Sequence, residues 1–567
     1  MRIINNKKIS FFIFFVFFFL NYNLLKAQGI PKPGEDFISI TKDGMWTWYG
    51  EPKAVYFEGK YRRTYMTWTQ RSGTKGIAYY DHDTKDTMVR DLPKMPYGGD
   101  DHNHPSIIMR PDGKILIFCT GHDGTEVTEL ISKNPEDITE WEPAIYPASK
   151  SWFCYPNAIF LKDEGDSGRF YLFFRDSLQE PWFTTSDDWG RTWKNPRYHL
   201  FHVSTYPNSA YKPYVKYASN NKDEIHIVIE RQNRQGNAAE KPIYFAKYKK
   251  GVFYSVDGKQ IATINQLPLL DTQLDTIFYA YRFGCSNTCY DVAIDSFGNP
   301  VIVMDMFKGT DINIYWYMRW TGKSWYKRPL INSGAYRGAQ SGFAAGITLD
   351  HENPNILYMC RQILKEAATP FNIMDTSYTN YTNNLSASKW IVIDSVHELD
   401  KWVTKDGGVT WDTIPITRNS ANKNFLPCVP RNHKEANARV NLIWLNGIYT
   451  SMSPDGYNAA VRMFPFKDNE IPPVKTILKT NNMNLDNNFI SICQQKIKIN
   501  IENINTTDVC IYSIKGEVVI GSNKLKKQLI YGINVFDLLK FNLGKGTYII
   551  LVKSKNSILK KSFVVVE

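Results

Sequence analysis

The chain has 567 residues and a formal net charge of +12, with 14% aromatic and 22% charged residues. This composition is typical of a globular protein and excludes an intrinsically disordered one. The first 27 residues carry four of the positive charges and residues 476–567 a net seven, which leaves +1 for the rest. Because the middle of the chain is nearly neutral, its charge gives no reason to expect a nucleic-acid partner. Any site that binds an anion must therefore be a local cluster of positive charge.

The N-terminal residues 1–27 have the pattern of a cleaved signal peptide. Basic residues precede a run of Phe, Ile, Val and Leu at positions 11–20, and Ala27 offers a small residue for cleavage. No later run of about eighteen apolar residues could span a membrane. We therefore expect a secreted or cell-surface monomer without a membrane span.

From Ile30 to about Pro465 the sequence consists of short β-rich runs separated by turn signals, with no convincing amphipathic helix. Residues 186–193 (SDDWGRTW) and 404–411 (TKDGGVTW) share the pattern S/T-x-D-x-G-x-T-W. They predict Asp-box turns, in which Asp caps backbone N–H groups, Gly takes a positive φ and Trp packs under the hairpin. Weaker turn signals extend the repeat to about seven units of 40 to 70 residues. We therefore predict an all-β protein with a seven-bladed β-propeller over residues 28–470. The N-terminal strand is a candidate to complete the last blade.

Two histidines lie twenty positions apart at the ends of a predicted hairpin. Strands at 106–109 and 115–120 are joined by a tight turn at 111–114. A hairpin brings its open ends together, so His102 and His122 should lie side by side. A lone His is more often an ordinary loop residue. Two His at matching ends of a hairpin, flanked by Asp and Gly, make a functional site as good an interpretation as two loop residues.

Three further segments place polar and aromatic residues at strand ends. They are residues 152–157 with Tyr155, 171–176 with Arg175, and 211–217 with Tyr214. For each tyrosine taken alone, packing in the core or at the rim is a sufficient explanation of its position. Arg175 is harder to explain in this way, because a cation at the end of an apolar strand requires an anionic partner.

Eight cysteines are too few for a disulfide scaffold in a chain of this length. Cys285 and Cys289 are close enough in sequence to supply two ligands of a zinc site, with His199 or His202 as distant partners. Buried, unpaired thiols are the more frequent arrangement. A structural zinc or calcium ion is the only bound ion we consider, and we expect catalysis to require no cofactor.

The composition changes after Pro472-Pro473, where the chain becomes rich in Asn and Lys. Residues 476–567 predict a small C-terminal β-sandwich. Within it, residues 509–519 (VCIYSIKGEVV) and 543–552 (LGKGTYIILV) resemble the C-terminal sorting domain of type IX secretion in Bacteroidota. The resemblance implies a contact with the type IX secretion machinery, and the alternative is an ordinary accessory sandwich.

These residue types suit β-elimination across a uronic acid. A cation neutralises the carboxylate, a base removes the C5 proton and an acid protonates the leaving oxygen. Arginine binds a carboxylate with two parallel hydrogen bonds. Tyrosine serves as base or acid if a neighbouring cation lowers its pKa, and histidine can share either task.

From Met45 to about Pro465 the chain also resembles the BNR-repeat propellers that include the ulvan lyases. The resemblance rests on residues 100–103 with 121–122, 155–157, 171–175, 212–217, 291–295 and 404–411. It implies a propeller that cleaves a sulfated, uronate-containing anionic polysaccharide by β-elimination. It places the implied catalytic residues at His102, His122, Tyr155, Arg175 and Tyr214, with Tyr155 as acid or base and Arg175 as the neutralising cation. The candidate substrate-binding residues are Lys212, which stands where the family often has Arg, Tyr217 and Asn103.

Two other functions stay open at this point. A glycoside hydrolase, such as a rhamnosidase acting next to glucuronate, usually needs two facing carboxylates. Asp100, Asp101 and Asp123 are available, but the sequence shows no clear pair. The third alternative is a non-catalytic propeller whose aromatic side chains stack on sugars.

Overall fold

The structure is a computed structural model of the chain. It describes residues 37–93, 95, 98–176, 179–204, 211–233, 242–280, 285–308, 312–334, 346–364, 395–418, 420–434, 440–465, 490–493, 496–501, 508–513, 518–520, 532–537, 546–553 and 558–565. The predicted signal peptide and the Pro472-Pro473 break lie outside these residues. The chain forms two compact units, Met1–Lys475 and Thr476–Glu567.

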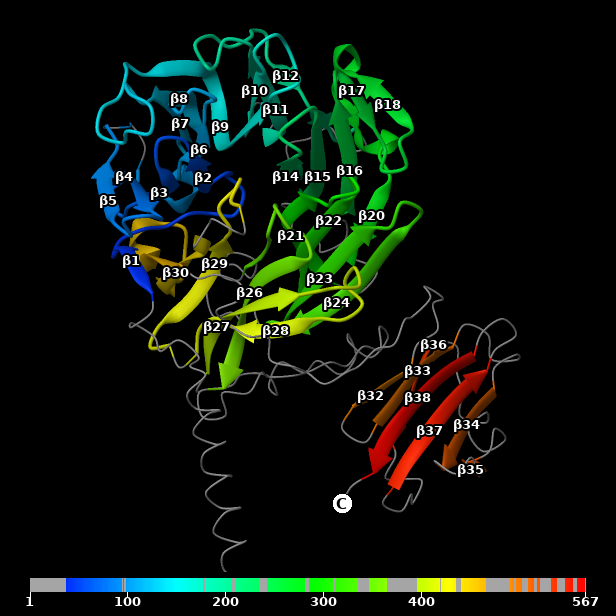
Figure 1. Cartoon of the computed structure of the whole chain (residues 1–567). Helices are drawn as coiled ribbons and strands as arrows, with labels where there is room; N and C mark the ends of the chain where they lie inside the picture. The colour runs from blue at the N-terminus through cyan, green and yellow to red at the C-terminus, as the bar shows by residue number, and fades with distance from the viewer. Residues whose placement is uncertain are drawn as a thin grey trace, which may run out of the picture. The chain divides into compact units, whose positions relative to one another are not determined.

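The described regular structure is all-β apart from short 3-10 helices, as predicted. In the first unit, antiparallel sheets follow one another around a circle (Figure 1). The first sheet has four strands: β2 (Ala54–Glu58), β3 (Arg62–Thr69), β4 (Lys75–Asp81) and β5 (Thr87–Asp91).

A seven-stranded sheet comes next. Its strands are β6 (Ser106–Met109), β7 (Ile115–Thr120), β8 (Gly124–Ile131), β9 (Ile145–Leu161), β10 (Arg169–Arg175), β11 (Pro181–Ser186) and β12 (Tyr198–His199). The 17-residue strand β9 pairs with β8 along its first part and with β10 along its second. It therefore joins two groups of four strands.

The circle continues with a sheet of β14 (Tyr211–Ser219), β15 (Glu224–Asn233), β16 (Pro242–Lys249), β17 (Val252–Tyr254) and β18 (Gln260–Thr263), to which β20 (Thr276–Tyr279) adds by pairing with β16. Beside it, β13 (Phe201–His202) pairs in parallel with β19 (Leu269–Leu270). Two four-stranded sheets follow, one of β21 (Ser286–Ile294), β22 (Pro300–Lys308), β23 (Ile312–Trp320) and β24 (Trp325–Asn332), the other of β25 (Ile347–Leu349), β26 (Ile356–Leu364), β27 (Ser395–Val403) and β28 (Asp412–Pro415).

The last sheet closes the circle. It contains β29 (Lys423–Cys428), β30 (Val440–Tyr449), β31 (Tyr457–Pro465) and the N-terminal strand β1 (Ile38–Thr41), which pairs with β31. The 3-10 helices are η1 (Asp101–Asn103), η3 (Ile264–Gln266), η4 (Asp271–Gln273) and η7 (Pro454–Gly456). Within the described residues, no helix has the length and hydropathy needed to cross a membrane.

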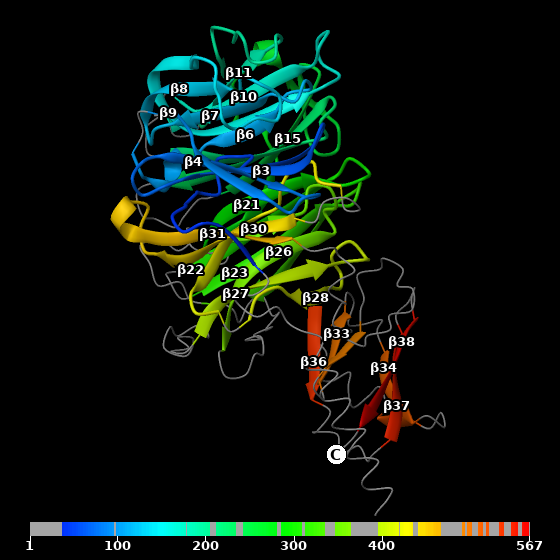
Figure 2. The same ribbon diagram turned by 60° about the vertical axis from the view of Figure 1, so that its left-hand side comes forward.

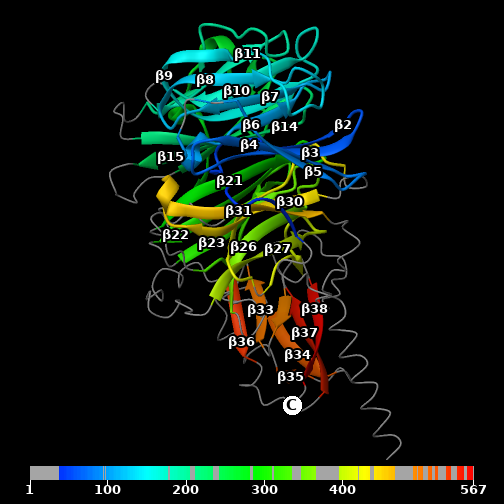
Figure 3. The ribbon, with the colours of Figure 1, turned by 90° about the vertical axis from the view of Figure 1, so that its left-hand side faces the viewer.

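Each sheet buries both faces because it packs between its two neighbours in the circle. Strand β7 is buried along its whole length, and Ile77 of β4 shares one apolar cluster with Ile107 and Ile117. On the far side, Phe173 of β10 packs with Tyr217 and Ile227 of the next sheet. Figures 2 and 3 show these sheets from the side, with β6–β10 above β3 and β4 and with β21–β27 below.

Both predicted Asp boxes form the same turn. In the first, Asp188 Oδ1 accepts from the backbone N–H of Thr192 at 2.8 Å, and Gly190 has φ 84°. In the second, Asp406 Oδ1 accepts from the N–H of Thr410 at 2.8 Å, and Gly408 has φ 100°. The turns are thus structural, as the sequence pattern predicts.

The second unit is also built of β-strands. One antiparallel sheet has β32 (Ile490–Cys493), β33 (Lys496–Ile501) and β36 (Gly532–Asp537); the other has β34 (Asp508–Ser513), β35 (Val518–Ile520), β37 (Gly546–Lys553) and β38 (Ile558–Val565).

Candidate active site

The two histidines at the hairpin ends lie against each other, as predicted. Their rings are stacked with centroids 4.1 Å apart and an interplanar angle of 3°. Helix η1 fixes the first of them, because the Asp100 side chain caps this helix by accepting from the backbone N–H of His102 at 2.8 Å. The hairpin of β6 and β7 then carries the chain back to His122.

Asp100 bridges the two imidazoles. One carboxylate oxygen lies 2.8 Å from Nδ1 of His102, and the other lies 3.1 Å from Nδ1 of His122. The buried Asp101 also contacts Nδ1 of His102, and it accepts a hydrogen bond of 2.9 Å from the Tyr449 hydroxyl. Both carboxylates therefore hold the histidine pair in place.

The state of charge of His102 follows from these partners. Burial by itself lowers the pKa of His102, but the charges of Asp101 and Asp100 raise it well above its usual value. Hydrogen bonds from His102 and His122 likewise outweigh burial and lower the pKa of Asp100. His102 is therefore an imidazolium at neutral pH, and Asp100 is a carboxylate.

Tyr155 reaches the histidines because the backbone of β9 is distorted. The register between β9 and β10 pairs Phe173 with Asn157 but Arg175 with Cys154, so a bulge lies at Tyr155-Pro156. Tyr155 itself has φ 58°, in the left-handed region. Its ring centroid lies 5.4 Å from that of His102.

Arg175, at the end of β10, completes the cluster. Its guanidinium carbon lies 4.8 Å from the Tyr155 ring centroid and 5.8 Å from that of Tyr214, and its side chain is only 3% exposed. One terminal nitrogen donates to Asp123 Oδ1 at 2.9 Å. The predicted anionic partner of Arg175 is thus Asp123, the residue that directly follows His122.

Two polar groups in this cluster have no hydrogen-bond partner among the described residues: the hydroxyl of Tyr155 and Nε of Arg175. Both residues line a small cavity of about 20 Å³ together with Tyr49, Asn157 and Tyr214. This volume holds about one water molecule. The side chains of His122 and Asp123, at the rim of this cluster, are more open to solvent, being 30% and 36% exposed.

The protonation state of Tyr155 follows from its burial. Burial raises the pKa of Tyr155 well above its usual value, and the lowering effect of Arg175 does not compensate. Arg175 thus acts in the direction that the sequence indicates as a condition for a catalytic tyrosine, but burial has the larger effect in the free protein. Tyr155 is therefore a neutral phenol at neutral pH.

The remaining site predictions have different outcomes. Tyr214 belongs to the cluster and stacks on Tyr49, with centroids 4.2 Å apart. Tyr217 borders the same cavity but is buried against Phe173, with centroids 4.2 Å apart. Asn103 is also buried, and its amide donates to the carbonyl oxygen of Gly98 at 2.9 Å. The side chain of Lys212 lies outside the part of the chain that the structure describes.

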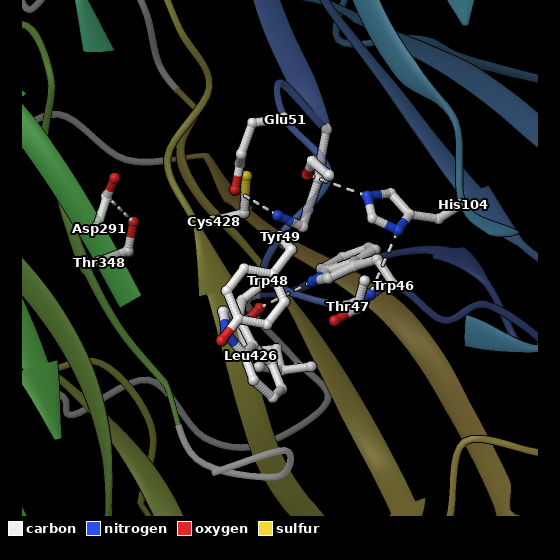
Figure 4. Close-up of polar contacts among 12 residues, drawn as sticks. Trp46, Thr47, Trp48, Tyr49, Glu51, His104, Asp291, Thr348, Leu426 and Cys428 are labelled. Atoms are coloured by element: carbon white, nitrogen blue, oxygen red, sulfur yellow. Dashed lines mark hydrogen bonds and ion pairs between the residues drawn. The ribbon is translucent and has the colours of Figure 1, made fainter. Parts of the chain in front are cut away.

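Sequence reasoning missed Tyr49, which comes from the segment before β2. Several long-range contacts anchor this segment (Figure 4). The indole N–H of Trp46 donates to the carbonyl oxygen of Leu426 at 3.2 Å, and the N–H of Thr47 lies 3.4 Å from Nδ1 of His104. No local motif marks Tyr49, because its partners in the cluster, Tyr155 and Tyr214, lie more than a hundred residues away.

Two groups of described residues offer three metal-ligand atoms within 4.8 Å of one another: Asp100, His102 and His122, and Glu180, His199 and His202. Neither group contains the predicted zinc ligands Cys285 and Cys289. Both cysteines are buried in an apolar cluster with residues such as Met304. The structure therefore does not join them to His202, which meets His199 and Glu180 instead.

Comparison with known proteins shows similarity to one family model and to two enzymes. Residues 63–333 match the BNR repeat-containing family. The chain is 25% identical over 338 residues to an ulvan lyase of Alteromonas sp. (strain LOR), covering 51% of this chain and 66% of that protein. It is 25% identical over 307 residues to Ulvan Lyase-PL25 of Pseudoalteromonas sp. (strain PLSV), covering 46% and 60%. At 25% identity the similarity to ulvan lyases is distant, and the matches span less than two thirds of each relative's length.

Among solved structures, the chain aligns with polysaccharide lyase Uly1 at a TM-score of 0.46 and 10% identity, covering 76% of this chain and 98% of that one. It aligns with the WD40 domain of SCAP from fission yeast at a TM-score of 0.35 and 10% identity, covering 77% and 100%. Scores this low carry no argument about function.

Proposed function

We propose that this protein is a polysaccharide lyase that cleaves a uronate-containing, ulvan-like polysaccharide by β-elimination. The observation that carries the proposal is the cluster of two cations, His102 and Arg175, around the Tyr155 hydroxyl, which has no hydrogen-bond partner among the described residues. The distant similarity to two ulvan lyases supports the same reaction class.

The cations prepare the substrate. The uronate carboxylate accepts hydrogen bonds from the guanidinium of Arg175, whose Nε has no partner within the described protein, and lies near the His102 imidazolium. Neutralising the carboxylate makes the C5 proton more acidic, and such preorganised charge is the largest contribution in many enzymes.

Two groups then move protons. His122 is the base that takes the C5 proton through Nε2, since its Nδ1 lies 3.1 Å from the orienting Asp100. The C5–H electrons form the C4=C5 double bond, and the C4–O bond breaks. Tyr155, a neutral phenol, gives its proton to the leaving oxygen. No step requires a metal ion or organic cofactor.

The hydrolase alternative is less well supported by this arrangement. Asp100 lies between two imidazoles, Asp101 contacts His102 and Tyr449, and Asp123 is paired with Arg175. All three carboxylates are therefore engaged with partners, and none faces another across an open site as glycoside hydrolysis usually requires.

The same proposal extends to architecture and location. The first unit is a seven-bladed propeller if the seven-stranded sheet counts as two blades that share β9. We further propose that residues 1–27 direct export and that residues 476–567 are a type IX sorting domain, so that the enzyme acts at the cell surface or outside the cell.

A direct assay tests the reaction. The purified protein, incubated with ulvan without added cofactor, should release unsaturated oligosaccharides that absorb in the ultraviolet. Reducing ends that appear without this absorbance would show hydrolysis instead. Binding to ulvan without any cleavage, or silence across a panel of polyuronates, would remove the lyase assignment.

A further inference from the structure

A second histidine cluster lies on the turn that follows Arg175. Glu180 closes this turn just before β11, His199 belongs to β12 and His202 to β13. Nε2 of His199 lies 2.8 Å from one oxygen of Glu180, and Nδ1 of His202 lies 3.0 and 3.1 Å from its two oxygens. Two imidazoles thus converge on one carboxylate, and the proposed elimination uses none of the three groups.

We propose that Glu180, His199 and His202 bind a divalent metal ion of the Zn²⁺ class. Two imidazole nitrogens and one carboxylate are a ligand set that zinc uses in proteins, with a fourth position open to water. Imidazole ligands favour Zn²⁺ and similar transition metals, whereas Ca²⁺ and Mg²⁺ prefer sites made entirely of oxygen.

The distances require only a small adjustment. Tetrahedral zinc with bonds of about 2.0–2.1 Å places its ligand atoms about 3.3 Å from one another. The separations between each histidine nitrogen and Glu180, 2.8 to 3.1 Å, differ from this by a few tenths of an ångström, and all three ligand atoms lie within 4.8 Å of one another. Rotations of the two imidazoles about their side-chain bonds supply such a shift without moving the backbone.

The surroundings hold the ligands in orientation. The His199 ring stacks on Trp182 with centroids 4.3 Å apart and an interplanar angle of 5°, and the N–H of Val203 donates to Glu180 Oε1 at 3.2 Å. Contacts of this kind around metal ligands fix their geometry.

The site is accessible from solvent on its histidine side. The side chain of Glu180 is 6% exposed, whereas those of His199 and His202 are 17% and 29% exposed. An ion can therefore enter past the imidazoles, while the buried carboxylate contributes the negative charge.

The location indicates what the ion would do. Arg175 pairs across the strands with Pro181, the residue next to Glu180, and the N–H of Asp176 donates to the carbonyl oxygen of Glu180 at 3.0 Å. A metal ion would tie this turn to β12 and to β13, which pairs with β19. It would therefore position the backbone that carries Arg175 without touching the substrate.

Calorimetry on the metal-stripped full-length chain tests the site without any polysaccharide. ZnCl₂ should bind with one equivalent per chain, far more tightly than CaCl₂ or MgCl₂. The variants His202→Ala and Glu180→Gln should lose this equivalent, and circular dichroism checks that they are folded. Failure of the lyase assay would leave this outcome unaffected.

Two matched variants separate this site from the other ligand groups. Binding should persist in His122→Ala, which removes a ligand of the other histidine cluster, and in the double variant Cys285→Ala, Cys289→Ala. Loss of zinc in either would move the ion to that group and overturn the proposal. So would full binding in both His202→Ala and Glu180→Gln, or no binding by the unmodified chain.

A thermal measurement gives an independent readout. An ion that binds only the folded chain raises the midpoint of thermal unfolding as its concentration increases. Zn²⁺ should raise the midpoint of the unmodified protein and leave that of Glu180→Gln in place. An equal rise in both would contradict a site built on Glu180.

Discussion

Tyr155 combines a strained backbone with an unpaired side chain. A bulky residue at φ 58° costs on the order of 1–3 kcal/mol, and such strain is common where a site needs a particular orientation. Here the bulge turns the ring toward Arg175 and His102. Its hydroxyl finds no protein partner among the described residues, which suits a group that waits for a substrate oxygen.

Replacing Tyr155 by Phe removes only this hydroxyl. We expect kcat on ulvan to fall by about 10²-fold or more, the usual contribution of a general acid, with little change in thermal stability. Tyr79→Phe is the matched control, because Arg63 lies over that buried ring at 3.8 Å in a similar Arg–Tyr stack away from the site. Steady-state kinetics and thermal unfolding check both; full activity in Tyr155→Phe would exclude it as the acid.

Replacing Arg175 by Lys keeps the charge but removes the planar fork. Hydrogen bonds to charged groups contribute about 1.5–3 kcal/mol each, so kcat/KM should fall by about ten- to a hundredfold. The control is Arg63→Lys, since Arg63 also stacks on a tyrosine and pairs with an aspartate, Asp81, at 2.9 Å. Equal losses of activity in the two variants would show a general effect on folding and no role of Arg175 at the substrate.

Local patterns predicted the positions of these side chains but not their state of charge. The hairpin brings His102 and His122 together, and the neighbouring strand ends bring Tyr155 and Arg175 beside them. The pKa of Tyr155 depends on burial by Tyr49, from the segment before β2, and by Tyr214 of β14. Such packing has no signature in the sequence near Tyr155.

At the scale of elements, the first Asp box, between β11 and β12, contacts β8, from which β10 and β9 separate it in the strand order. The indole N–H of its Trp193 donates to Glu129 Oε2 of β8 at 2.7 Å, and Gly190 packs so closely that an added Cβ would lie 2.5 Å from Glu129 Oε1. Burial under this turn raises the pKa of Glu129 to about 8. The turn motif was predictable from the sequence, whereas the carboxylate beneath it was not.

This raised pKa makes stability depend on pH. Between about pH 4.5 and 8 the folded chain holds a proton on Glu129 that the unfolded chain releases, so stability falls as pH rises, by at most about 1.4 kcal/mol per pH unit. Glu129→Gln lacks this titration. Its stability relative to the unmodified protein should therefore increase from pH 5 to pH 8 in urea unfolding.

Glu142 provides the control of opposite sign. It pairs with Lys114 and Arg191, and hydrogen bonds from them lower its pKa to about 2. Its contribution is present above the unfolded value of about 4.5 and is lost as pH falls toward 2. Glu142→Gln should thus destabilise the protein at neutral pH, and a pH-independent difference for Glu129→Gln would refute the assigned pKa.

At the scale of the whole molecule, the proposed site belongs to one of the two units. Every residue of the proposed site lies in the unit Met1–Lys475, and the strands of Thr476–Glu567 form sheets of their own. The spacing of turn signals predicted an all-β chain with a change of architecture near residue 470. The turn signals could not predict that one strand, β9, would belong to two groups of four strands. Its 17 residues contain no turn that marks a boundary between the groups.

A chain that ends at Lys475 should therefore keep its activity. We expect unchanged kcat and KM on ulvan and an unchanged midpoint for the main thermal transition, since the described strands of each unit pair among themselves. Kinetics and calorimetry on the shortened and full-length proteins provide the comparison. A large drop in either would mean that the second unit supports the site.

The N-terminal strand should have the opposite effect, because it closes the circle of sheets. In the pairing of β1 with β31, Ile38 is opposite Met463 and Thr41 is opposite Val461, while Ile40 is buried. Deleting Ile38–Thr41 exposes the edge of β31, and an exposed edge strand promotes aggregation. We expect a thermal midpoint lower by several degrees and oligomers in size-exclusion chromatography, whereas Ser39→Ala, at the exposed position of the same strand, should behave as the unmodified protein. A deletion variant that stays monomeric with an unchanged midpoint would show that the last sheet holds without β1.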